Sequence, residues 1–274
     1  MLNKFSYKGI NFEGISEGGI RTSIMIPSLS MILDIGNLPY NHAHFDNLLL
    51  THGHLDHSAG VPYYISQRSL RKLKPPNIYV PEELYEDLNS ILKIYQKIEG
   101  FDYLYNLIPA PLEKHFLLNN NYVFRALKSF HRIPSQGYTI YEKTKKLKNN
   151  YKNLDSNQIL KLKESGEEIS EEKLLPIISF SGDTKIEYIL ENPDVANSRI
   201  LFIECTYLDE KKGKEIAREW GHTHIDEIVE NASSFKNEKI VLIHFSKRYS
   251  PKIVKELVYS KIPDFLKPKV ECFI

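Results

Sequence analysis

Residues 48–60 read LLLTHGHLDHSAG, so three histidines and an aspartate fall within six positions directly after an apolar run. These side chains are His52, His54, Asp56 and His57. Neutral imidazole and carboxylate groups are the ligands that zinc and similar divalent ions prefer. A single buried histidine is more often held by an ordinary hydrogen bond. Four ligand-type side chains at the end of a strand instead favour a metal site, with enough groups to begin two.

One loop cannot enclose two ions, so the remaining ligands must come from the ends of other strands. Candidates are His131 in SFHRIPSQGY, Asp183 in SFSGDT and His244 in LIHFSKRY. Each alone would be weak, because histidine and aspartate are common at strand ends. Their order and their flanking residues make the set specific.

Hydrophobic patterns predict the elements that position these side chains. Short apolar, β-branched stretches between turn residues predict strands, and a spacing near 3.6 predicts helices. The predicted strands are 18–27, 30–36, 47–51, 121–130, 136–144, 174–183, 198–207 and 239–246, and the predicted helices are 58–73, 81–99, 224–235 and 249–260. Strands alternating with helices in two groups indicate an α/β fold with two sheets and helices outside.

Composition predicts one globular domain over residues 1–274. A 42% hydrophobic content can close a sizeable core, and no run approaches the length of a membrane span. The N-terminus lacks a signal-peptide pattern, and Cys205 and Cys272 are too few for a disulfide framework, so they are expected to be free core thiols. These features predict a cytoplasmic protein that has no membrane partner.

A net charge of +1 excludes a generally basic nucleic-acid-binding protein, so an anionic partner must meet a local patch. Residues 141–151, YEKTKKLKNNY, carry such a patch. Together with the following SNQILKLKESGEEIS they look like an excursion from the core, at about 141–172. The lysines fit either a solvated loop or contacts with phosphates.

The succession HGHLDH, HRIPSQGY, FSGDT, GHTH and HFSKRY resembles ribonuclease Z, the tRNA 3′-processing endonuclease of the metallo-β-lactamase superfamily. The likeness spans nearly the whole chain. The N-terminal segment EGISEGGIRTSIMIPSLSMILDIG is most similar to the short form of the plant type and departs from the Gly-Thr-Gly-Ser-like turn of the bacterial type. The resemblance implies an αββα sandwich of two mixed β-sheets with outer helices, and a dinuclear zinc site along one edge.

The resemblance also implies a role for each site residue. It assigns His52, His54 and His131 to one ion, Asp56, His57 and His244 to the other, and Asp183 to both. Two such ions would activate a water for attack on a phosphodiester, with Asp56 as the orienting base. Asp34 is expected either to orient the histidine loop or to satisfy nearby backbone amides.

The leaving 3′ oxygen needs a proton, and the GHTH motif supplies the donor. His222 matches the family position, whereas His224 is expected to be a structural residue at a helix N-terminus. Arg248 after the last motif would grip a phosphate or form a surface ion pair.

The implied substrate is precursor tRNA, bound by the excursion through Lys145, Lys146 and Lys148. Members of the family are commonly homodimers, so a homodimer is a candidate assembly. Two other functions remain open. One is a metal-dependent phosphodiesterase for a small substrate such as a cyclic nucleotide, which a disordered or dispensable excursion would favour. The other is a non-catalytic RNA-binding subunit, although no ligand is missing.

Overall fold

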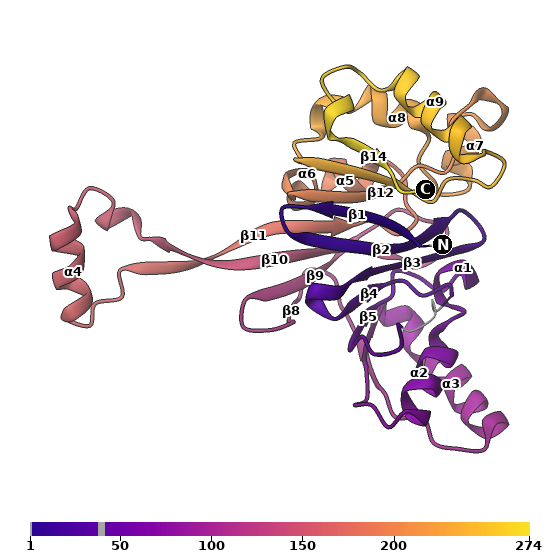
Figure 1. Cartoon of the computed structure of the whole chain (residues 1–274), viewed down its shortest axis with the longest axis horizontal. Coiled ribbons are helices and arrows are strands. Elements are labelled where there is room, and N and C mark those ends of the chain that lie inside the picture. Colours follow the sequence, from indigo (N-terminus) through magenta and orange to yellow (C-terminus); the bar gives the residue numbers. More distant parts are fainter. Residues whose placement is uncertain (1, 38–41) are drawn as a thin grey trace.

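Two seven-stranded sheets build the chain in this computed structural model, which describes residues 2–37 and 42–274 (Figure 1). The first sheet, in spatial order, consists of β1 (Asn3–Tyr7), β2 (Ile10–Glu17), β3 (Arg21–Ile26), β4 (Met31–Leu33), β5 (Asn47–Leu49), β6 (Asn77–Val80) and β7 (Asn106–Pro109). The second consists of β14 (Val270–Cys272), β13 (Lys239–Ile243), β12 (Ile200–Glu204), β11 (Ser170–Phe180), β10 (Gln136–Leu147), β9 (Tyr122–Lys128) and β8 (His115–Leu117). Both sheets contain parallel and antiparallel pairs, so both are mixed.

Helices cover the outer face of each sheet. The helices that follow strands of the first sheet are α1 (Leu55–Ser58), α2 (Val61–Leu70) and α3 (Tyr85–Glu99), and those that follow strands of the second sheet are α5 (Glu187–Glu191), α6 (Pro193–Asn197), α7 (Lys214–Glu219), α8 (Ile225–Glu230) and α9 (Pro251–Lys261). Helix α4 (Ser156–Glu164), between β10 and β11, covers neither sheet (Figure 1). Buried residues of α2 and α3 pack on the first sheet, and those of α5, α6, α8 and α9 pack on the second. This arrangement confirms the predicted αββα sandwich.

Strand residues are buried on both faces, because one face meets the opposite sheet and the other meets helices. Leu49 belongs to the core between the sheets, while Leu48 and Leu50 pack in the helix layer. Such strands appear in the sequence as continuous apolar runs rather than as alternating patterns. The run LLLT before the first histidine is therefore the signature of a central strand that ends at the site.

Strands β9 to β13 of the second sheet agree with the sequence prediction, which missed the short strands β8 and β14, and the first sheet differs more from the prediction. Strands β1, β2, β6 and β7 were not predicted, because their residues are only half-buried or the strands are short. The predicted helix 58–73 is two helices, α1 and α2, and the predicted helix 224–235 ends as α8 at Glu230 and continues as a short 3-10 turn.

The arm, residues 141–172, projects from the body of the molecule (Figure 1). Strands β10 and β11 continue past the sheet as a two-stranded antiparallel ribbon, with Lys145 opposite Glu172 and Lys146 opposite Glu171. Helix α4 lies at the tip, as expected for SNQILKLKE, and Asp155 caps its N-terminus. The interpretation of the lysine stretch as a loop is wrong, because these residues are hydrogen-bonded strand.

None of the helices in the described ranges is both long and apolar enough to cross a bilayer. Both cysteines are free, as predicted: Cys205 is buried, and Cys272 is half-buried.

Candidate active site

Asp34 holds the histidine loop (residues 51–58) from beneath. It is fully buried and has a φ of 55°, a conformation that non-glycine residues rarely adopt. Its carboxylate accepts hydrogen bonds from the backbone N–H and the hydroxyl of Thr51, at 2.7 and 2.8 Å, and from Nδ1 of His57 at 2.7 Å. These contacts confirm that Asp34 orients the loop, and they show that it satisfies a backbone amide as well.

Gly36 allows the loop to lie directly against the end of β4. A Cβ at Gly36 would stand 1.9 Å from the carbonyl oxygen of Asp56, so a side chain cannot fit without movement. The next residues are tied as well, because Ile35 N–H donates to the carbonyl of His57 at 2.7 Å. Asp56 and His57 lie on the single turn of α1 rather than in an irregular loop, which corrects the sequence interpretation.

Hydrogen bonds determine which nitrogen of His52 and His57 is free. The hydroxyl of Thr51 donates its one proton to Asp34, so it must accept from Nδ1 of His52 at 2.9 Å. Nδ1 of His57 donates to Asp34 directly. In both rings Nε2 is therefore the nitrogen that faces the site, and it can bind a metal when it carries no proton.

Hydrogen bonds also engage Nδ1 of two histidines that come from other strand ends. Nδ1 of His131 donates to the carbonyl of Gly221 at 2.9 Å. The hydroxyl of Thr206 donates to Glu204, so it accepts from Nδ1 of His244 at 3.0 Å. His244 has a φ of 62°, directly after β13. In each of these rings Nε2 is again the nitrogen that faces the site.

The candidate ligands converge as two groups that share Asp183. The ligand atoms of His52, His54, His131 and Asp183 all lie within 4.8 Å of one another, and so do those of Asp56, His57, Asp183 and His244. These are the seven residues expected from the sequence, in the expected grouping.

The first group has the chemistry of a cation site. Nδ1 of His54 lies 3.2 Å from Nε2 of both His52 and His131. Burial is the largest factor lowering the pKa of His52, His54 and His131, which favours neutral rings. Lone pairs that face one another at this distance repel, and a cation between them would remove the repulsion.

Asp183 gives independent support for a cation. Its Oδ1 is buried and, among the residues that the structure describes, finds no hydrogen-bond partner. It lies 3.2 Å from Nε2 of His57 and 3.3 Å from Nε2 of His244. A buried carboxylate oxygen without a donor is costly unless a positive charge compensates it. The donor set therefore fits divalent metal ions.

His222 lies beside these groups and is held by a carboxylate that the sequence did not identify. Nδ1 of His222 donates to Glu204 at 2.8 Å, and Glu204 is fully buried. Burial opposes the charged form of the ring, but Glu204 raises the pKa of His222 to about 9. The signal for Glu204 was present, since it is an acid at the end of the apolar strand SRILFIECTY.

His224 has the structural role expected of it. It is the N-cap of α8, where its Nδ1 accepts from the N–H of Asp226 at 3.2 Å and its own N–H donates to Glu227 at 3.0 Å. The two histidines of GHTH therefore differ in role: His224 caps a helix, and only His222 lies beside the candidate metal ligands.

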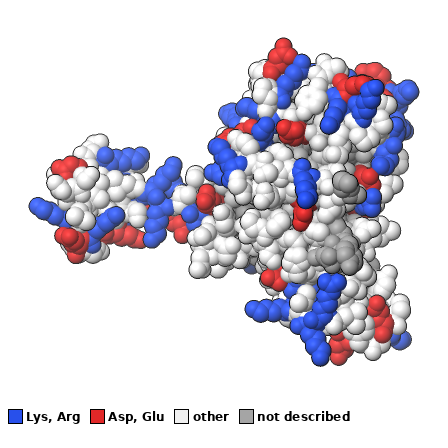
Figure 2. All heavy atoms as spheres, in the orientation of Figure 1, with Lys and Arg blue, Asp and Glu red and all other residues white. Residues whose placement is uncertain are grey.

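The substrate-binding candidates lie apart from the metal ligands. Lys145 and Lys146 are exposed, but they face opposite sides of the ribbon, because successive side chains of a strand alternate. Lys148 pairs with Glu168 at 3.8 Å. Figure 2 shows basic and acidic atoms interspersed over the arm. The arm therefore presents scattered lysines among glutamates rather than one basic face.

Arg248 lies closer to His222 than the lysines of the arm do. Its guanidinium stands 5.9 Å from the ring centroid of Tyr207, whose own centroid is 6.1 Å from that of His222. The neighbouring Lys247 forms the surface ion pair considered for this region, with Glu17 at 2.9 Å.

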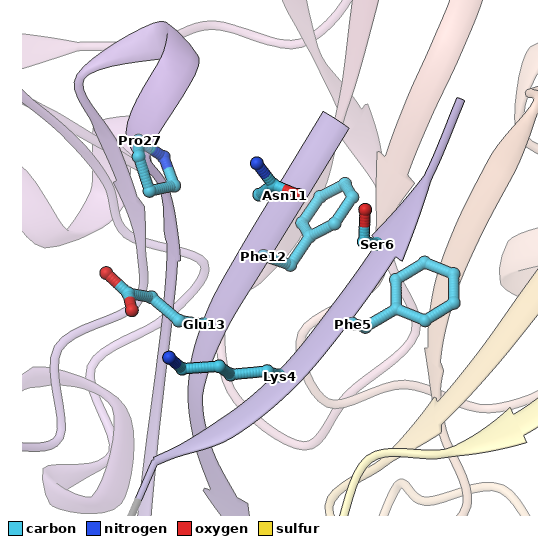
Figure 3. Close-up of a pocket in the computed structure, with 7 residues that line it drawn as sticks. All are labelled: Lys4, Phe5, Ser6, Asn11, Phe12, Glu13 and Pro27. Atoms are coloured by element: carbon cyan, nitrogen blue, oxygen red, sulfur yellow. The ribbon is translucent and has the colours of Figure 1, made fainter. Parts of the chain in front are cut away.

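A pocket of about 480 Å³ lies elsewhere, on β1 and β2 (Figure 3). Its lining residues are Lys4, Phe5, Ser6, Asn11, Phe12, Glu13 and Pro27. None of the candidate ligands or catalytic residues lines it, so it is not the site of the chemistry.

Named relatives match nearly the whole chain. The tRNase Z TRZ1 of Arabidopsis thaliana is 38% identical over 265 residues, which are 96% of this chain and 94% of that protein. The chloroplastic tRNase Z TRZ2 of the same plant is 40% identical over 266 residues, which are 95% of this chain and 75% of that protein. Residues 28–170 match the protein-family model described as Anti-Pycsar protein Apyc1.

Solved structures share the fold. The metallo-β-lactamase fold protein YhfI of Bacillus subtilis superposes with a TM-score of 0.62 at 14% identity, covering 94% of this chain and 93% of that one. The short form of human tRNase Z superposes with a TM-score of 0.60 at 19% identity, covering 86% and 93%. At these identities the likeness shows the fold alone, and it confirms the metallo-β-lactamase fold.

Proposed function

This chain belongs to the tRNase Z family, and on that premise we propose that it is a metal-dependent endoribonuclease that removes the 3′ trailer from precursor tRNA. The observation that carries the proposal is the His222–Glu204 pair beside two groups of metal ligands that share Asp183. A cation site offsets the charge that develops on the phosphate, and a proton donor assists departure of the alkoxide leaving group, so both accelerate hydrolysis of a phosphodiester.

We propose two zinc ions as the cofactors. His52, His54 and His131 would hold one, Asp56, His57 and His244 the other, and Asp183 both. When bound, such ions supply the Lewis acidity that activates water and offsets the charge on the phosphate. Support comes from the hydrogen bonds at Nδ1 that leave Nε2 of four rings facing the site, and from the unpaired Oδ1 of Asp183.

The chain's own residues would perform the proton transfers. Asp56, whose Oδ2 lies 3.4 Å from Nε2 of His244, would orient the attacking water. His222 is held through Nδ1, so its Nε2–H is the proton available for the leaving 3′ oxygen. Cleavage then leaves a 3′-hydroxyl on the tRNA and a 5′-phosphate on the trailer.

Residues outside the centre would bind the RNA. We assign Lys145, Lys146 and Lys148 to the tRNA backbone and Arg248 to a phosphate near the scissile one. The arm stands away from the body (Figure 1), so in a homodimer it would be free to reach RNA that is bound to the second chain. Light scattering coupled to size exclusion tests the homodimer, and a monomer mass would reject it.

We propose the cytoplasm as the compartment, which the two free cysteines support. Since one relative is chloroplastic and another is named a nuclear ribonuclease Z, microscopy of the tagged protein is the direct test.

The test of function is cleavage of a precursor tRNA with a 3′ trailer by the metal-loaded protein, with both product ends mapped. Cutting directly after the discriminator nucleotide, the unpaired nucleotide that follows the acceptor stem, supports the proposal, and Asp56→Ala should abolish it. An intact precursor alongside hydrolysis of a small phosphodiester would reject tRNA processing and support the small-substrate alternative.

The alternatives have less support. The match to the family described as Anti-Pycsar protein Apyc1, to which residues 28–170 belong, ends before Asp183, His222 and His244, so it does not decide the substrate. A disordered arm would have favoured a small substrate, but the arm is a formed ribbon with a capped helix. A non-catalytic role would be rejected by stoichiometric metal and turnover.

A further inference from the structure

An arginine–aromatic pair lies one residue outside the candidate metal centre. Arg132 follows His131, and its guanidinium stands 4.6 Å from the ring centroid of Trp220. Trp220 precedes Gly221, whose carbonyl accepts the hydrogen bond from Nδ1 of His131. The pair is therefore built onto the contact that orients a candidate ligand.

The position of this contact is closely fixed. Gly221 has a φ of 75°, and a Cβ there would stand 2.8 Å from Nδ1 of His131 and 3.0 Å from the backbone nitrogen of Arg132. The backbone of Trp220 is held as well, because its backbone N–H donates to the carbonyl of Ile216 in α7. The two segments cannot separate without disturbing His131, so the indole has a defined place beside the site.

Trp220 is a large side chain of which 49% of the surface is exposed. It is also the only tryptophan of the chain. An exposed aromatic ring with an arginine against it is the arrangement on which unpaired nucleobases stack in RNA-binding proteins. The cation–π contact with Arg132 would stiffen the indole before the RNA arrives.

The location indicates which base would stack there. Trp220 and His222 are two residues apart, so their Cα atoms are separated by at most about 7.6 Å. The ring centroids of His131 and His222 lie 5.3 Å apart. His222 is assigned to the leaving 3′ oxygen, which belongs to the last nucleotide that the tRNA retains. The base of that nucleotide lies one ribose away from the oxygen.

We propose that Trp220, backed by Arg132, is the stacking platform for the base of the last retained nucleotide. This inference rests on the proposed tRNA-processing function. Stacking accepts any base, because every base has a π-face, so the platform would fix the place of the cut without selecting the base. The enzyme should therefore accept all four bases at the discriminator position and discriminate against the absence of a base.

The kinetic test is a cycle of one protein change and one RNA change. Precursor tRNAs that carry A, G, C, U or an abasic residue at the discriminator position are cleaved by the wild-type protein, Trp220→Phe and Trp220→Ala. We expect the abasic substrate to raise KM roughly ten-fold with wild-type protein. Trp220→Ala should raise KM equally for all four bases, with no further rise for the abasic substrate, and Trp220→Phe should stay close to wild type.

Two controls separate stacking from a structural role. Turnover of bis(p-nitrophenyl) phosphate, which carries no nucleobase, should fall far less in Trp220→Ala than cleavage of precursor tRNA. Phe265→Ala removes an aromatic ring that is 63% exposed and not among the site residues, and it should leave every substrate unaffected. If the rise in KM caused by Trp220→Ala and the rise caused by the abasic substrate multiplied when the two were combined, the platform would be refuted. Equal losses on RNA and on the small substrate would refute it as well.

A binding measurement needs no cleavage. Because Trp220 is the only tryptophan, its fluorescence reports on the platform in the unmodified protein. A tRNA that ends at the discriminator nucleotide should quench it, and the same tRNA with an abasic end should not. Equal quenching by both would refute the inference. Failure of the wild-type protein to cut any precursor would instead reject the proposed function, and the quenching pair would still decide whether Trp220 stacks a base.

Discussion

Glu204 lies 2.8 Å from Nδ1 of His222, and none of its surface is exposed. Its second oxygen accepts from the hydroxyl of Thr206 at 2.6 Å, and that hydroxyl accepts from Nδ1 of His244. One buried carboxylate thus orients both the proposed proton donor and a candidate metal ligand. The position of the donor and the position of the second ligand group are coupled through it.

Replacing Glu204 by glutamine should therefore impair proton donation more than metal binding. We expect kcat on precursor tRNA to fall roughly 10²-fold or more, the usual contribution of a general acid. Bis(p-nitrophenyl) phosphate should be affected far less, because nitrophenolate leaves without a proton. Steady-state kinetics on both substrates measure the difference. The matched control is Glu219→Gln, an exposed acid of α7, and equal losses on the two substrates would contradict the assignment.

Replacing Asp34 by asparagine should weaken metal binding although Asp34 is not a ligand. The change leaves Nδ1 of His57 facing a weaker, neutral acceptor and disturbs both contacts with Thr51. Loss of such an outer hydrogen bond typically costs about 10- to 100-fold in metal affinity. Competition with a chromophoric chelator measures the affinity, and the exposed Asp102→Asn is the control. An unchanged affinity would show that Asp34 serves only the backbone.

Metal content should depend on which ligand is removed. Because Asp183 belongs to both groups, Asp183→Ala should lose most of both ions, whereas His131→Ala should retain the ion of the Asp56 group. Elemental analysis after dialysis counts the ions, with about two per chain expected for the wild-type protein. Metal should also raise the melting temperature of the wild-type protein, because it binds only the folded state. One ion in both variants would contradict a shared Asp183.

Neutralising Lys145, Lys146 and Lys148 should weaken binding of precursor tRNA and flatten its salt dependence. Each lost phosphate contact lowers the slope of log K against log salt by about 0.7 to 0.9. The total change should stay below that of three full contacts, because Lys148 already pairs with Glu168. Filter binding across a salt series provides the measurement.

The control for the lysine variant is Lys93→Ala with Lys97→Ala, two exposed lysines of α3. Hydrolysis of a small phosphodiester should be unchanged in both variants. An unaltered salt slope in the triple variant would exclude these lysines from the RNA interface.

The sequence was informative where chemistry and strand ends coincide. His52 to His57, His131, Asp183 and His244 each follow an apolar run, so both their proximity and the strands behind them were predictable. Glu204 follows such a run too, but a lone acid at a strand end has no pattern that separates it from an ordinary one. Its role depends on a fold that brings it to His222, 18 residues later.

In the arm, the residues were visible in the sequence but their contacts were not. Its lysines were visible in the sequence, but their pairing with glutamates of β11 depends on a register between segments that are about 25 residues apart. Local composition cannot report such a register. The same reason explains the missed edge strand β14, which is held by a short parallel pair with β13, about 30 residues earlier in the chain. Strand β1 pairs locally with β2, and it was missed because its residues are only half-buried or exposed.

The paired ribbon also determines how the reach of this protein can vary. Each strand residue spans about 3.4 Å, so deleting two residues from one strand together with their two partners from the other would shorten the ribbon by about 7 Å. An unequal deletion would shift every pair beyond it, and a shift by one residue turns all those side chains to the other side. Related chains that differ in the length of this ribbon should therefore differ by matched insertions on its two strands, and the ribbon acts as a ruler between the tip helix and the cut.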